Sequence, residues 1–195
     1  MLHLLARAVL IAAAPAIAVF AVIAAPAAAP EALGSSAYDF TMTTIDGKPM
    51  PFGQYKGRVL LVVNTASFCG YTDQYQGLET LYQTYKSKGL TVVGVPSGDF
   101  GGQEYARNNE IKQFCESKFG IKFPMSEKNV VTGQKAAPFY RWAATVLGRD
   151  KVPKWNFHKY LVGRDGRLIE AFGSKSTPMS PEVTAAVEAA LAAKG

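Results

Sequence analysis

The feature that most constrains the fold of this chain is a pair of uninterrupted apolar runs with an amphipathic segment between them. The runs cover residues 59–63 and 90–95 and are rich in Val and Leu. Strands covered on both faces of a parallel sheet have this composition, whereas half-exposed strands alternate apolar and polar residues. Between the runs, apolar residues recur every three or four positions over residues 75–87, and Gly89 follows as a helix stop. The sequence therefore predicts a right-handed βαβ unit.

The remaining patterns extend this unit on both sides. Helices are expected at about residues 109–118 and 137–147, and a closing helix begins after the N-cap Ser180. Asp-Gly pairs favour tight hairpin turns within residues 38–50 and between the runs 157–162 and 167–172. This order of elements predicts an α/β protein with a thioredoxin-like fold. Its central mixed sheet would be flanked by helices and preceded by an N-terminal hairpin.

The N-terminal segment differs in composition from the rest of the chain. Residues 8–30 carry no charge, follow Arg7 and end in small residues, which is the layout of a secretory signal peptide. We assign residues 1–27 to this peptide, leaving its cleavage site open, residues 28–37 to a linker and residues 38–195 to one domain. Export to a bacterial periplasm is expected. The alternative is an uncleaved inner-membrane anchor, because about 20 apolar residues suffice to span a bilayer.

Charge and metal-ligand residues limit the classes of partner. Without Arg7 of the leader, 20 basic residues face 15 acidic ones, and the basic residues are scattered along the chain. A nucleic-acid partner is therefore not expected. Two cysteines and a single histidine outside the leader lack the spacing of metal ligands, so neither a metal site nor a cofactor is expected.

Cys69 is the candidate nucleophile. It follows the first apolar run and precedes the helix predicted at residues 75–87. Reactive groups of open α/β sheets lie at such strand ends, and a helix N-terminus lowers the pKa of a nearby thiol below its free value of about 8.5. Gly70 and Thr72 indicate a tight turn here. A reactive thiol is thus favoured over a small buried core residue.

Three segments resemble motifs of the glutathione peroxidase family. Residues 64–72 (NTASFCGYT) resemble its active-site segment, in which cysteine or selenocysteine occupies the position of Cys69. Residues 96–104 (PSGDFGGQE) and 155–157 (WNF) resemble its second and third motifs, and the resemblance extends over about residues 38–191. It implies a thiol peroxidase that reduces hydrogen peroxide and organic hydroperoxides to water and alcohols.

The family resemblance also implies which side chains surround the sulfur. Gln103, Trp155 and Asn156 match the family's catalytic Gln, Trp and Asn. Amide and indole N–H groups are donors that stay uncharged at neutral pH, and they can stabilise the negative charge that develops as a peroxide bond breaks. Phe68 stands where many relatives carry Lys or Gln, which removes a cation beside Cys69.

Cys115 resembles the resolving cysteine of thioredoxin-dependent family members. The implied cycle converts Cys69 to a sulfenic acid, which condenses with Cys115 to a disulfide. A thioredoxin-like protein would reduce that disulfide, with glutathione as another possible donor. Because Cys115 lies on the apolar face of a predicted helix, this helix would have to unwind locally.

Other functions remain open on sequence grounds. A peroxide sensor or thiol–disulfide relay would use the same residues without turnover. A general thiol–disulfide oxidoreductase would need a second cysteine at Thr72, and a structural domain would hold Cys69 and Cys115 in a permanent disulfide. His158 is assigned a structural role. The short connection between Leu147 and Trp155 resembles monomeric members, including those that accept bulky lipid hydroperoxides.

Overall fold

The computed structural model describes residues 36–194. The predicted signal peptide and all of the linker up to residue 35 lie outside the described residues. Within the described part, no helix combines the length and the apolar character needed to cross a membrane. The strands and α-helices are β1 (Thr41–Thr43), β2 (Pro49–Pro51), β3 (Val59–Thr65), α1 (Gln74–Tyr85), β4 (Leu90–Pro96), α2 (Asn108–Phe119), α3 (Pro138–Leu147), β5 (Lys159–Val162), β6 (Leu168–Phe172) and α4 (Pro181–Ala192).

The central sheet has the strand order β4-β3-β5-β6. Strands β3 and β4 are parallel and in register from Val59 opposite Leu90 to Thr65 opposite Pro96. Strands β5 and β6 join antiparallel, and β1 and β2 form a separate antiparallel hairpin. The predicted βαβ unit, mixed sheet and N-terminal hairpin are thus confirmed.

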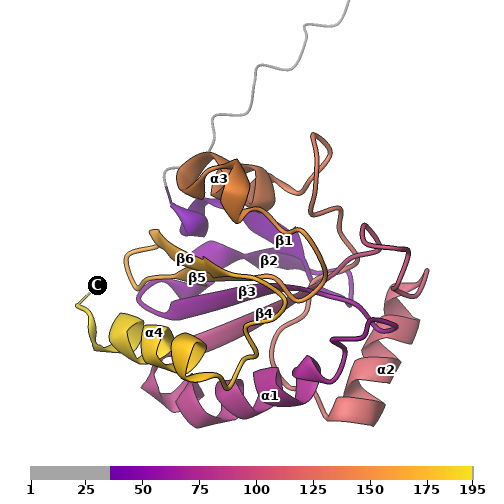
Figure 1. Ribbon diagram of the computed structural model, residues 1–195, viewed down its shortest axis with the longest axis horizontal. Coiled ribbons are helices and arrows are strands. Elements are labelled where there is room, and N and C mark those ends of the chain that lie inside the picture. Colours follow the sequence, from indigo (N-terminus) through magenta and orange to yellow (C-terminus); the bar gives the residue numbers. More distant parts are fainter. Residues whose placement is uncertain (1–35, 195) are drawn as a thin grey trace, which may run out of the picture. The chain divides into compact units, whose positions relative to one another are not determined.

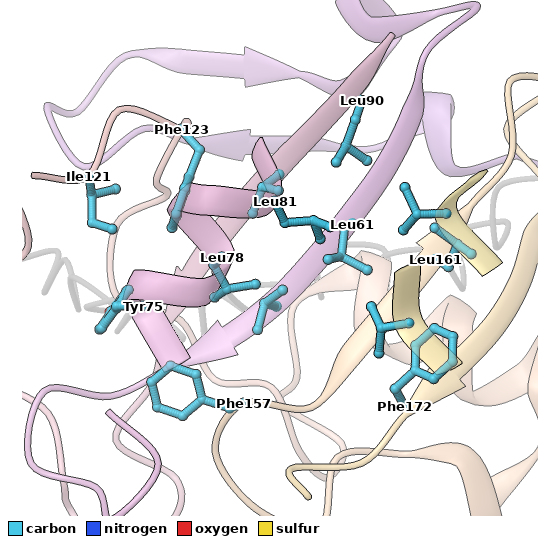
Figure 2. Close-up of a cluster of buried hydrophobic side chains, with 14 of the residues drawn as sticks. Leu61, Tyr75, Leu78, Leu81, Leu90, Ile121, Phe123, Phe157, Leu161 and Phe172 are labelled. Atoms are coloured by element: carbon cyan, nitrogen blue, oxygen red, sulfur yellow. The ribbon is translucent and has the colours of Figure 1, made fainter. Parts of the chain in front are cut away.

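Two hydrophobic clusters cover the two faces of the sheet, because alternate residues of a strand point to opposite sides. Leu61 of β3 belongs to the cluster with α1, α2 and α4, and Figure 2 shows Leu78 and Leu81 of α1 in the same group. Leu60 and Val62 belong to the second cluster, with residues of α3 and the hairpin. In Figure 1, α1 and α4 lie on one side of the sheet and α3 on the other. Strands β3 and β4 are both buried throughout, as their apolar composition predicts.

Two element boundaries differ from the sequence prediction for identifiable reasons. Strand β5 begins at Lys159 rather than at 157, because Phe157 has a φ of 64°, which no strand residue adopts. The fold begins before Tyr38: Ala37, which the sequence places in the linker, is fully buried, and its N–H donates to the carbonyl of Gly166 at 2.9 Å. A Cβ added at Gly166 would lie 2.1 Å from the Ser36 hydroxyl, so this close approach requires glycine.

Candidate active site

The loop between β3 and α1 is closed by the side chain of Thr72. Its hydroxyl accepts a hydrogen bond from the Cys69 amide at 2.9 Å and donates to the carbonyl of Ala66 at 3.0 Å. The Thr72 amide in turn donates to the Cys69 carbonyl at 3.0 Å. These bonds hold Cys69 in a tight turn at the carboxyl end of β3, as predicted. A threonine at this position is therefore a structural part of the loop.

The sulfur of Cys69 lies close to a backbone amide of its own loop. Its Sγ accepts from the Tyr71 N–H at 3.4 Å, and the residue is 8% exposed. Helix α1 begins only at Gln74, so the amide that meets the sulfur belongs to the loop rather than to the helix N-terminus invoked from the sequence. The Tyr71 N–H is thus a hydrogen-bond donor that faces the sulfur.

Gln103 lies beside the Cys69 loop and contacts Asn156 directly. The Phe68 amide donates to the Gln103 carbonyl at 3.0 Å, which joins the segment after β4 to the residue before Cys69. The Gln103 Oε1 accepts from Asn156 Nδ2 at 3.0 Å. This bond orients the Gln103 amide, and its Nε2 forms no hydrogen bond with the described residues, so it is available as a donor.

The turn that carries Trp155 and Asn156 is tied to the end of β3 by Asn64. Asn64 Nδ2 donates to the Trp155 carbonyl at 3.1 Å, and the Phe157 amide donates to the Asn64 carbonyl at 2.6 Å. Asn156 is fully buried, whereas Trp155 is 40% exposed and its ring packs on Phe100 with centroids 5.8 Å apart. Tryptophan is more often core, so this exposure favours a functional role.

Cys115 lies on α2 and has a very different setting. Its side chain is fully buried in the cluster that also contains Cys69, and both cysteines are free thiols. Burial raises the pKa of Cys115 to about 12. The Tyr75 hydroxyl opposes part of this rise in the pKa, although it forms no hydrogen bond of normal geometry. The negative charges of Glu104 and Glu116 raise the pKa of Cys115 further. Cys115 is thus a protonated, inaccessible thiol while α2 is intact.

His158 takes no visible part in nucleophile activation. Its ring packs edge-on against Tyr160 with centroids 4.7 Å apart, and it is 6% exposed. Burial and the neighbouring Lys159 lower its pKa to about 4, so it is neutral at physiological pH. This setting agrees with the structural role assigned from the sequence. Among residues 36–194, no group of three or more His, Cys, Asp or Glu side chains is arranged to hold a metal.

Sequence reasoning missed several polar residues that shape this region. Asn64 was quoted only as part of a motif, yet it clamps the turn carrying Trp155. Glu104 follows Gln103 and is buried; burial raises the pKa of its carboxyl, while the Ser67 hydroxyl and the Tyr105 amide lower it. Lys159 is fully buried in β5. A charged or amide residue inside an otherwise apolar strand was the signal that could have identified Asn64 and Lys159.

The family model described as glutathione peroxidase matches residues 37–144. A glutathione peroxidase-like peroxiredoxin of Schizosaccharomyces pombe is 46% identical over 144 residues, covering 72% of this chain and 90% of that protein. The chain belongs to the glutathione peroxidase family. The predicted family is therefore confirmed, and with it the enzyme class: the protein is a peroxidase. Because the family model ends at residue 144, the assignment of Trp155 and Asn156 depends on the geometry described above.

Further relatives agree with the family and with the fold. A hydroperoxy fatty acid reductase of Synechocystis is 42% identical over 159 residues, covering 77% of this chain and 93% of that protein. The crystal structure of T. cruzi GPX1 superposes with a TM-score of 0.64 at 35% identity, covering 80% of this chain and 97% of that chain. A thiol:disulfide interchange protein of Chlorobium tepidum, at 19% identity and a TM-score of 0.60, shares the fold. The thioredoxin-like fold is confirmed.

Proposed function

We propose that this peroxidase reduces hydroperoxides with Cys69 as the attacking thiolate and with Gln103, Trp155 and Asn156 as the polar groups around the peroxide. The observation that carries the proposal is the hydrogen bond between Asn156 and Gln103, made by residues 53 positions apart. The Gln103 carbonyl also accepts from the Phe68 amide, and both neighbours of Asn156, Trp155 and Phe157, are hydrogen-bonded to Asn64 at the end of β3. These bonds support the proposal because they join the segments that carry the three side chains to the end of β3 and to the loop of Cys69.

In the first step, the Cys69 thiolate attacks the terminal oxygen of the hydroperoxide. An S–O bond forms as the O–O bond breaks, which leaves a sulfenic acid and an alkoxide. The alkoxide takes up the proton that the thiol lost and leaves as the alcohol, or as water when the substrate is hydrogen peroxide. The Gln103 amide and the Trp155 indole supply hydrogen bonds that stabilise the developing negative charge.

In the second step, the Cys115 thiol attacks the Cys69 sulfenic acid. An S–S bond forms, the S–O bond breaks, and the departing hydroxide combines with the proton of Cys115 to give water. The burial of Cys115 and its pKa of about 12 mean that α2 must open before this thiol can react. Both residues belong to the hydrophobic cluster on the α2 side of the sheet, and opening of α2 would free Cys115 to reach Cys69.

In the third step, an external dithiol reduces the Cys69–Cys115 disulfide. We infer a thioredoxin-like protein, because a dithiol can reduce an intramolecular disulfide in one encounter. A steady-state assay with cumene hydroperoxide tests this, with either a thioredoxin system or glutathione as sole donor. Turnover with thioredoxin alone is expected. Equal turnover with glutathione would contradict the inferred donor, and stoichiometric oxidation of Cys69 without turnover would instead indicate a sensor or relay.

The surface beside Cys69 favours bulky apolar hydroperoxides. Phe68 is 54% exposed and Trp155 is 40% exposed, which is unusual for large hydrophobic side chains. Phe68 packs edge-on against Tyr105 with ring centroids 4.4 Å apart, which fixes its position. We propose that these rings contact the organic part of the substrate. Replacing Phe68 by Ser should raise the KM for a fatty acid hydroperoxide and leave that for hydrogen peroxide unchanged.

Export and a monomeric state complete the proposed function. Support for export is the uncharged N-terminal run, and cell fractionation would test it, with membrane retention as the sign of an anchor.

Support for a monomer is the short connection from α3 to Trp155, which holds only the 3₁₀ turn Arg149–Lys151 as regular structure. Light scattering on the purified protein would test this state.

A further inference from the structure

Lys159 is a lysine in the protein core without a carboxylate partner. Its side chain is fully buried, and among residues 36–194 no carboxylate lies within ion-pair distance of its ammonium. Nζ donates instead to two uncharged oxygens, Gln74 Oε1 at 2.8 Å and the Phe157 carbonyl at 2.6 Å. Buried lysines without an ion-pair partner are rare because desolvation of the charge is costly, so this arrangement calls for a physical reason.

The two acceptors of Lys159 belong to the two halves of the active site. Phe157 directly follows Trp155 and Asn156, and Gln74 is the first residue of α1, the helix that follows the Cys69 loop. Gln74 is itself held, since its Nε2 donates to the Ser174 carbonyl at 2.6 Å. The ammonium therefore bridges the turn that carries the hydrogen-bond donors and the helix that anchors the nucleophile loop.

The Phe157 backbone needs this support. Its φ of 64° is the only positive value among the described non-glycine residues, and the left-handed conformation is strained for an L-residue. The ring is fully buried and meets the Tyr75 ring edge-on, with centroids 5.4 Å apart. Figure 2 shows both rings in the buried cluster. The ring contact fixes the side chain, and two hydrogen bonds fix the backbone. The Phe157 amide donates to the Asn64 carbonyl, and the Phe157 carbonyl accepts from the Lys159 ammonium.

We propose that Lys159 is a positioning residue of the peroxidase: its ammonium holds the Phe157 carbonyl, and so keeps Trp155 and Asn156 in place beside the Cys69 loop. This inference builds on the proposed function, in which those two residues contact the peroxide. Lys159 itself does not touch the reacting atoms in this account. Its effect is on the reaction with peroxide and not on the intrinsic reactivity of the thiol.

The charge of Lys159 changes within the neutral pH range. Burial lowers its pKa to about 7, partly opposed by Glu182 of α4, and His158 beside it is uncharged at this pH. Loss of the proton turns two charge-assisted hydrogen bonds into weaker neutral ones. The positioned state therefore becomes less populated as pH rises through about 7.

The test compares two reactions of the same sulfur. Rate constants for Cys69 with hydrogen peroxide and with iodoacetamide are measured from pH 5.5 to 9 by quenching and peptide mass spectrometry. Both need the thiolate, so the ratio of peroxide to iodoacetamide rate cancels the titration of Cys69. In the wild type this ratio should fall as pH rises through about 7. A ratio that stays constant with pH would overturn the proposal.

Two variants and one control sharpen the test. Lys159→Met should lower the ratio of peroxide to iodoacetamide rate at pH 6 on the order of tenfold or more, because the hydrogen-bond donors would be misplaced. It should also abolish the pH dependence of this ratio. Gln74→Glu gives the ammonium a carboxylate partner and should move the fall of the ratio to higher pH, which keeps the test valid if Lys159→Met does not fold. Lys88→Met, in the exposed 3₁₀ turn Lys86–Lys88 that follows α1, removes the same charge and should behave like the wild type.

The outcomes separate this inference from the proposed function. If wild-type Cys69 is not the residue oxidised by peroxide, the proposed function fails. If Cys69 is oxidised one-for-one but Lys159→Met keeps the wild-type ratio at every pH, only the role of Lys159 fails. Equal losses in the peroxide and iodoacetamide reactions would also contradict it, because they would show a general disturbance of the Cys69 loop.

Discussion

The two cysteines of this protein lie in one hydrophobic cluster but in opposite kinds of local structure. Cys69 lies in a turn, receives an N–H bond at its sulfur and has the exposed Phe68 beside it. Cys115 lies within a regular helix, fully buried, and burial raises its pKa to about 12. The same functional group is thus prepared for attack at one position and protected at the other.

In the proposed mechanism, this difference lets a single domain order two reactions of two thiols. A thiol that reacts first must be reachable in the closed fold, whereas a thiol that reacts second can wait until a helix opens. Protection of Cys115 also keeps it from consuming peroxide itself, because only a thiolate is an effective nucleophile. The contrast between Cys69 in its loop and Cys115 in α2 therefore predicts how substitutions at and around the two cysteines should act.

The largest effect is expected for Cys69, the cysteine in the loop. Cys69→Ser removes the attacking sulfur, so peroxide turnover with the thioredoxin system should fall on the order of 10³-fold or more, as when a nucleophile is deleted. Cys115→Ser is the matched control. It should lose turnover with thioredoxin and still allow one-for-one oxidation of Cys69. Retained turnover in Cys69→Ser would contradict the mechanism.

Protection of Cys115 can be measured directly by alkylation. With a pKa of about 12 in the folded state against about 8.5 in an unfolded chain, its thiolate fraction at pH 8 should be on the order of 10³-fold lower when folded. Iodoacetamide labelling with and without urea, read by mass spectrometry, gives this ratio. Fast labelling of Cys115 in the folded protein would remove the contrast between the two cysteines.

A substitution at the C-terminal end of α2 should make Cys115 more accessible to reagents. Gly120 ends this helix with a φ of 62°, so Gly120→Ala should destabilise the helix end by about 1 kcal/mol, a roughly fivefold shift. Cys115 labelling and disulfide formation after peroxide should both accelerate by about that factor. Gly57→Ala, at a φ of 79° and distant in sequence from α2, is the control for strain alone. Unchanged disulfide formation would show that opening of α2 is not required.

A separate prediction concerns stability. The pKa of Lys159 is lowered to about 7 in the folded state, against an ordinary value of 10.5. Between these values the unfolded chain binds one more proton than the folded one, so the wild type gains stability as pH rises, by up to about 1.4 kcal/mol per pH unit. Lys159→Met should lack this gain in urea denaturation at pH 7 and 9.5. Parallel pH dependences of the two proteins would contradict the shifted pKa.

Most of the fold could be predicted from local patterns in the sequence. The apolar runs, the Asp-Gly turn before β6 and the N-cap Ser180, whose hydroxyl accepts from the Val183 amide at 3.4 Å, depend on residues close in sequence. The placement of Cys69 at the end of β3 followed from the same patterns. These signals determine the elements and their ends, so they also predicted where Cys69 lies in the fold.

The contacts that assemble the site could not be predicted in this way. The backbone conformation of Phe157, the clamp made by Asn64 and the bridge made by Lys159 join segments as much as 91 residues apart. Motif resemblance could name Gln103 and Asn156, but not the hydrogen bond between them. Such tertiary contacts depend on the packing of the whole sheet, which no local pattern encodes.

The central claim is that peroxide oxidises Cys69 and that the opening of α2 then delivers Cys115 to it. The most direct test adds one equivalent of hydrogen peroxide to the reduced protein, followed by quenching at successive times and mapping of both cysteines. The account predicts an early Cys69 sulfenic acid that gives way to an intramolecular Cys69–Cys115 disulfide, at a rate independent of protein concentration. Accumulation of Cys69 sulfinic acid while Cys115 remains a thiol would contradict it.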